Sequence, residues 1–85
     1  MATATSAPTP NPNAMKFTLD VTLPGSIHFT SADAAADNPF AAAVFAAGGV
    51  ASVFGVNNFV TVNRQPGADW DAIVEAVRTS AAEHL

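Results

Sequence analysis

The sequence predicts a two-layer α+β fold in the order ββαββα, with one largely antiparallel four-stranded sheet and both helices on a single face. Two observations predict it. Four short segments have the alternation or β-branched character of strands, and two longer segments repeat apolar residues with a period of about 3.6, as amphipathic helices do. A chain of 85 residues has room for one domain.

The N-terminal residues 1–8 are rich in Ala, Thr, Ser and Pro, and we expect them to be a disordered tail. The domain proper is then expected at residues 9–85. Its first strand is predicted at residues 15–21, where apolar and polar side chains alternate strictly. Pro24-Gly25 suits the centre of a type II turn, so we expect a hairpin into a second strand at residues 26–30.

The first helix is predicted to begin at Asn38-Pro39, because asparagine caps helices and proline is favoured at the first helical position. Gly48-Gly49 should end it, since glycine readily takes the left-handed conformation that follows a helix.

Two further strands are predicted at residues 50–54 and 59–63, joined by a loop at residues 55–58. Asp69 should cap the last helix, on which apolar residues recur at helical spacing. Trp70 opens that apolar stripe and is interpreted as a core residue, with an exposed partner-binding anchor as the alternative. The expected core comprises Phe17, Leu19, Ile27, Phe29, Val44, Val60, Val62, Trp70, Ile73 and Val77.

Charge and hydropathy narrow the function classes. The net charge is −4, and Lys16, Arg64 and Arg78 stand apart in the sequence, so we expect no nucleic-acid partner. No uninterrupted apolar run approaches about 18 residues, so no membrane span is expected. The N-terminus has neither the features of a secretory signal nor those of a transit peptide, and the expected location is the cytoplasm.

The sequence offers little that could support catalysis or metal binding. There is no cysteine, and neither His28 nor His84 has a second ligand at suitable spacing, so we expect no metal site and no cofactor. Asp69, Asp71 and Glu75 are explained by the preference of helix N-termini for acidic residues. We therefore expect no enzymatic activity.

Asn11, Asn13 and Lys16 form the one surface candidate for partner binding. On the functional interpretation, they form a rigid recognition edge at the sheet border. On the structural interpretation, Asn13 ends the coil and Lys16 protects an edge strand from aggregation.

Residues 9–17 read TPNPNAMKF, in which a coil stiffened by proline changes into strand alternation. This string resembles the opening signature of the N-terminal domain of Nfu/NifU-like iron–sulfur cluster scaffold proteins. Other segments are similar to later parts of that family in the same order, namely residues 30–40, 44–50, 53–54, 59–62, 69–70 and 83–85. The resemblance therefore covers residues 9–85.

In that family, this domain precedes a second domain whose CxxC motif binds and delivers the cluster. Because the present chain has no cysteine, the resemblance implies an accessory protein-interaction module in cluster assembly or delivery. Its expected partner is a CxxC scaffold domain or a recipient apoprotein. The alternative is a small-molecule or peptide-binding module unrelated to clusters, using the sheet face or an edge strand. Met1 and a complete last helix favour a free-standing domain over a piece of a longer protein.

Overall fold

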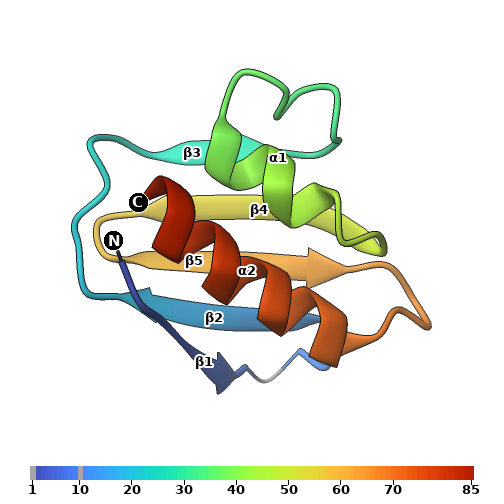
Figure 1. Cartoon of the computed structure of the whole chain (residues 1–85). Coiled ribbons are helices and arrows are strands. Elements are labelled where there is room, and N and C mark those ends of the chain that lie inside the picture. Colours follow the sequence, from blue (N-terminus) through green and yellow to red (C-terminus); the bar gives the residue numbers. More distant parts are fainter. Residues whose placement is uncertain (1, 10) are drawn as a thin grey trace.

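The computed structural model describes residues 2–9 and 11–85, and it places two helices over one face of a five-stranded sheet (Figure 1). The elements are, in chain order, β1 (Ala4–Pro8), β2 (Ala14–Leu19), β3 (Ile27–Phe29), α1 (Pro39–Phe45), β4 (Val50–Val56), β5 (Phe59–Arg64) and α2 (Trp70–His84). The expected α+β architecture is confirmed. The sheet has one strand more than the four expected, because β1 precedes the others.

The strands lie in the order β1-β2-β5-β4-β3, and each neighbouring pair is antiparallel. β5 and β4 thus lie between β2 and β3. Because β2 and β3 are not neighbours, the prediction of a hairpin at Pro24-Gly25 is wrong. Gly25 lacks the positive φ that a type II turn needs at that position. The chain instead passes the end of the β4–β5 hairpin, where the Leu23 amide donates to the Asn57 carbonyl oxygen at 2.6 Å.

The prediction of a disordered tail at residues 1–8 is wrong for residues 4–8, while Met1 lies outside the described residues. β1 pairs with β2 over its whole length, with Ala4 opposite Leu19. Ala2 and Ala4 are only 1% and 8% exposed, and the Ala2 amide donates to the Ala81 carbonyl oxygen of α2 at 3.3 Å. Backbone pairing and close packing of small alanines order this strand without any large apolar side chain.

Most of the expected core is buried between the sheet and the helices. The expected side chains that are fully buried are Phe17, Val44, Val60, Val62, Ile73 and Val77. Leu19 is also buried, at 3% exposure. The remaining three, Ile27, Phe29 and Trp70, are half-buried and pack against the rim of the core.

Both helices begin where the capping signals predict. The Asn38 Oδ1 accepts a hydrogen bond from the Ala41 amide at 3.1 Å, with Pro39 in the first turn of α1. The Asp69 Oδ1 accepts from the Asp71 amide at 2.9 Å at the start of α2. Within the described residues, neither helix has the length and apolar character needed to cross a membrane.

Glycines shape the two turns around β4. Gly48 and Gly49 have φ of +81° and +76°, and they reverse the chain between α1 and β4 as expected. At the other end, only Asn57 and Asn58 separate β4 from β5, so the loop expected at residues 55–58 is too long. Gly55 belongs to β4, where a Cβ would lie 2.9 Å from side-chain atoms of Leu23 and Ile27.

Candidate functional site

Within residues 2–9 and 11–85, no helix or second sheet covers the face of the sheet opposite α1 and α2 (Figure 1). Because side chains alternate along a strand, residues that are paired across strands point to the same face. The register aligns one row of uncovered side chains across four strands, namely Lys16, Thr61, Phe54 and His28. A neighbouring row contains Thr18, Phe59 and Val56.

Two aromatic contacts organise this surface, which we call the open face. The rings of His28 and Phe54 meet edge-on, with centroids 5.8 Å apart and an interplanar angle of 74°. The Lys16 ammonium lies 4.4 Å from the centroid of the Phe59 ring, within the range of a cation–π interaction. Phe54 is 41% exposed, and it is the large apolar side chain that stands out to solvent among the described residues.

Asn11 and Asn13 lie together in the turn between β1 and β2. The Asn11 Oδ1 accepts a hydrogen bond from the Asn13 amide at 2.9 Å, which is an Asx turn. The Thr9 Oγ1 lies 2.9 Å from the carbonyl oxygens of both Asn11 and Ala14 and so closes the turn from the other side. The Asn11 side-chain oxygen is therefore occupied within the turn, although the residue is exposed.

Asn13 and Arg64 connect this turn to the start of α2. The Arg64 Nε donates to the Asn13 Oδ1 at 3.3 Å, and one guanidinium nitrogen donates to the Ala68 carbonyl oxygen at 2.9 Å. The Arg64 guanidinium also lies 5.3 Å from the centroid of the Trp70 ring. The Trp70 Nε1 donates to the Pro12 carbonyl oxygen at 3.1 Å. Asn13, Arg64 and Trp70 thus hold the turn against the helix, and Trp70 is neither fully buried nor a free anchor.

Lys16 differs from the two asparagines because it lies on β2 and on the open face. It pairs with Ala7 of β1 and with Thr61 of β5, so β2 is an interior strand. The strand does not form the sheet border, and the interpretation of Lys16 as protection for an edge is wrong, because β1 occupies that edge. Its exposed ammonium instead lies among the aromatic side chains of the open face.

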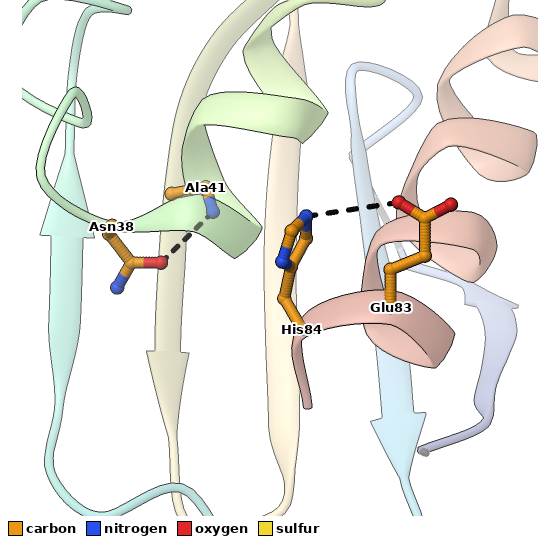
Figure 2. A network of polar contacts seen from close by, with 4 residues as sticks. All are labelled: Asn38, Ala41, Glu83 and His84. Atoms are coloured by element: carbon orange, nitrogen blue, oxygen red, sulfur yellow. Dashed lines mark hydrogen bonds and ion pairs between the residues drawn. The ribbon is translucent and has the colours of Figure 1, made fainter.

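A small pocket of about 240 Å³ lies where the β2–β3 connection meets the start of α1 and the end of α2. Its apolar lining includes Leu23, Ile27 and Phe40. Figure 2 shows two polar contacts beside it: the Asn38 Oδ1 accepts a hydrogen bond from the Ala41 amide, and the His84 Nε2 lies 3.9 Å from the Glu83 carboxylate. The polar side chains that line the pocket are Asp37, Asn38 and His84, and the last two have these interactions within the protein.

The groups needed for metal chemistry do not converge in the part of the chain that the structure describes. No three His, Asp or Glu side chains gather there as potential ligands. His28 and His84 lie on β3 and near the end of α2, in separate parts of the fold. The acids at the start of α2 include the cap Asp69 and the first-turn Asp71, as the sequence predicts.

Comparison with known proteins identifies the family. The model of the family described as "Scaffold protein Nfu/NifU N terminal" matches residues 5–85. The chain belongs to the Nfu/NifU N-terminal domain family. This family is linked to iron–sulfur cluster scaffold proteins. The match begins at residue 5, inside β1.

Two curated relatives of this Nfu/NifU N-terminal domain are much longer than the chain. A NifU-like protein of Schizosaccharomyces pombe is 36% identical over 84 residues, which is 94% of this chain and 32% of that protein. Conserved virulence factor C of Staphylococcus aureus is 31% identical over 77 residues, which is 89% of this chain and 21% of that protein. The chain thus spans about a third of one relative and about a fifth of the other.

Solved structures share the fold of the domain. Protein SAV1430 of Staphylococcus aureus has a TM-score of 0.77 at 28% identity, over 92% of this chain and 96% of that one. The NifU-like protein of Saccharomyces cerevisiae has a TM-score of 0.78 at 25% identity, over 94% of this chain and 75% of that one.

Sequence reasoning missed the aromatic part of the open face. Phe54 ends one predicted strand and Phe59 begins the next, and the sequence alone assigns neither side chain to a face of the sheet. The available signal was the alternation within β4, where Val53 and Gly55 are buried and Phe54 between them is exposed. The strand order is needed as well. Lys16 on β2 contacts the Phe59 ring because β5 lies beside β2, and His28 on β3 contacts the Phe54 ring because β4 lies beside β3.

Proposed function

We propose that this Nfu/NifU N-terminal domain is an accessory protein-interaction module in iron–sulfur cluster assembly or delivery. It docks onto a CxxC scaffold domain or a recipient apoprotein and does not itself hold the cluster. The observation that carries the proposal is the family match over residues 5–85 in a sequence without cysteine. Thiolates are the usual ligands of iron–sulfur clusters, so a role in docking fits these residues better than a role in ligation.

The turn between β1 and β2, together with Lys16, is the proposed partner-binding strip. Asn11 is exposed and preorganised by the Asx turn, so it loses little conformational entropy on binding. Asn13 supports the strip indirectly, since its side-chain oxygen receives the Arg64 hydrogen bond. Lys16 contributes the exposed charge.

The test is titration calorimetry of the domain against a cysteine-bearing CxxC scaffold domain and against a recipient apoprotein. The triple variant Asn11→Ala, Asn13→Ala, Lys16→Ala should bind at least several-fold more weakly while it remains folded. Single Asn11→Ala and Lys16→Ala variants separate the strip from the structural role of Asn13. If the wild-type domain binds neither class of protein, the proposed function is wrong; if the folded triple variant binds equally well, only the strip is wrong.

The absence of cluster ligation has a separate test. The isolated domain, incubated anaerobically with iron, sulfide and a reductant and then desalted, should show no visible absorption band. A stable coloured species with stoichiometric iron and sulfide would contradict this part of the proposal.

The alternative function is a small-molecule or peptide-binding module unrelated to clusters, using the sheet face or an edge strand. The pocket beside α1, of about 240 Å³, is below the range of about 300–1,000 Å³ that is typical of ligand sites. A hollow of about 520 Å³ between residues 2–5 and α2, and one of about 420 Å³ between α1 and α2, lie within that range. Pocket volume therefore does not decide between the two functions, and it is the family match over residues 5–85 that supports the protein-interaction module.

A further inference from the structure

The open face combines an exposed aromatic anchor with a basic group. Phe54 stands 41% exposed at the centre of the row that runs from Lys16 through Thr61 to His28. The edge-on contact with His28 supports its ring, and half-buried Val56 and Phe59 lie in the neighbouring row. An aromatic ring held in this way offers an apolar contact to a partner without losing much side-chain entropy.

The charge on this face is opposite in sign to that of the whole molecule. The outward residues of β2, β3, β4 and β5 include the Lys16 ammonium and the His28 imidazole but no carboxylate. Asp20 follows β2, and its carboxylate accepts a hydrogen bond from the Thr3 amide at 2.9 Å. The other acids are on α2 and in the loops before the helices, namely Asp33, Asp37, Asp69, Asp71, Glu75 and Glu83. A chain with net charge −4 thus presents a basic, aromatic surface.

The other two basic side chains do not extend this surface. Arg64 is engaged with Asn13, Ala68 and Trp70 beside α2. Arg78 lies exposed on α2, in the helical layer. Lys16 is therefore the permanent positive charge that the described residues place among the rings of the open face.

We propose that the open face docks an acidic segment of a partner protein, seating one apolar side chain against Phe54 and one carboxylate on Lys16. This inference rests on the proposed function, because it specifies the surface and the chemistry by which the partner is recognised. Charge complementarity selects this occupant. A second copy placed face to face would supply only another Lys16 and His28, and so no opposite charge. A nucleic acid would need several cations to neutralise its phosphates, and the face supplies one lysine.

The probe is a short synthetic peptide with a central leucine flanked by glutamates, titrated into the isotope-labelled domain and followed by amide NMR. The amide signals of Lys16, Phe54 and Thr61 should shift saturably. Lys16→Glu and Phe54→Thr should each weaken binding at least about fivefold, and added salt should weaken it for the wild type. Arg78→Glu is the matched control, because it makes the same change in net charge on the helical layer; its affinity should stay within about twofold of the wild type.

A second peptide, with lysine in place of each glutamate, should bind at least about fivefold more weakly. No saturable shift at millimolar acidic peptide, shifts confined to α1 and α2, or equal losses in Lys16→Glu and Arg78→Glu would each overturn the inference. Tighter binding of a single-stranded oligonucleotide to the same amides would also overturn it, in favour of nucleic acid. If the peptide binds but neither a scaffold domain nor an apoprotein does, the proposed function is contradicted and the inference about the open face is not. Scaffold binding that Phe54→Thr leaves unchanged would contradict this inference alone, because Phe54 is not part of the partner-binding strip.

Discussion

The two faces of the sheet are made by the same strands but have different tasks. On the covered face, Phe17, Val60 and Val62 are fully buried beneath the helices. On the open face, the residues next to them in sequence include Lys16 and Thr61, and Phe54 on the neighbouring strand is 41% exposed. Because successive side chains of a strand point to opposite faces, the same strand contributes buried apolar area that stabilises the fold on one face and exposed side chains of different chemistry on the other. Substitutions on the two faces should separate stability from binding.

The sharpest test of this difference compares two phenylalanines. Phe17→Ala should lower the free energy of unfolding by about 3–5 kcal/mol, because Phe17 is fully buried and its removal leaves a cavity. Phe54→Ala should cost less than about 1 kcal/mol, since its ring is already partly hydrated. Urea denaturation followed by circular dichroism measures both. Similar losses in the two variants would show that the faces do not differ as described.

The covered face also depends on the turn that leads from α1 into β4. Gly49→Ala should cost about 3 kcal/mol, because φ is +76° and the new Cβ would lie 2.6 Å from the Ala68 Cβ. Gly48→Ala is the matched control, with φ of +81° but open space around it, and should cost about 1–2 kcal/mol. Thermal melts should rank the two variants in this order; the reverse ranking would place the tight contact elsewhere.

Trp70 is intermediate between the buried side chains of the covered face and the exposed side chains of the open face. Because it is half-buried, Trp70→Ala should cost about 2 kcal/mol, less than for a fully buried tryptophan. Trp70→Phe keeps the aromatic ring but loses the hydrogen bond to the Pro12 carbonyl oxygen, and should cost about 1 kcal/mol. Chemical denaturation of both variants checks this. A loss of about 4 kcal/mol in Trp70→Ala would show that Trp70 contributes to stability as a fully buried core residue does.

The smallest predicted effect concerns β1, which extends the sheet beyond β2. If β1 is ordered, native-state hydrogen exchange should show amides within residues 4–8 at least about tenfold slower than in an unstructured chain. The control is a peptide of residues 2–9 alone, whose amides should exchange at unstructured rates. Equal exchange in the domain and in the peptide would restore the prediction of a disordered tail.

The sequence predicts the parts of this fold that depend on local chemistry. Capping explains the starts of α1 and α2 at Asn38 and Asp69, and alternation identifies β2 with Phe17 on its buried side. Local signals fail for β1, because its order comes from backbone pairing with β2 and from packing of alanines that contribute little hydrophobic signal. They also fail at Pro24-Gly25, where the strand order places β3 beside β4 and leaves no hairpin to form.

The sequence predicts the candidate site only in part, because strand pairing, which local signals do not show, brings some of its residues together. Asn11 and Asn13 are recognisable as turn residues, and their side-chain oxygens do serve the turn. The environment of Lys16 required the register, since the Phe59 ring beneath its ammonium comes from β5, far along the chain. A surface assembled from four strands has no continuous sequence motif, so only the pairing of the strands shows it.

The most direct test of the account is an amide chemical-shift map of the isotope-labelled domain titrated with an unlabelled CxxC scaffold domain. The account predicts that the perturbed amides lie in the turn between β1 and β2 and on the outward positions of β2, β4 and β5, with Lys16 and Phe54 among the strongest. Amides on the exposed side of α2, around Arg78, should keep their positions. Perturbations centred on α1 and α2, with the open face unchanged, would contradict the division of the sheet into a face that folds and a face that docks.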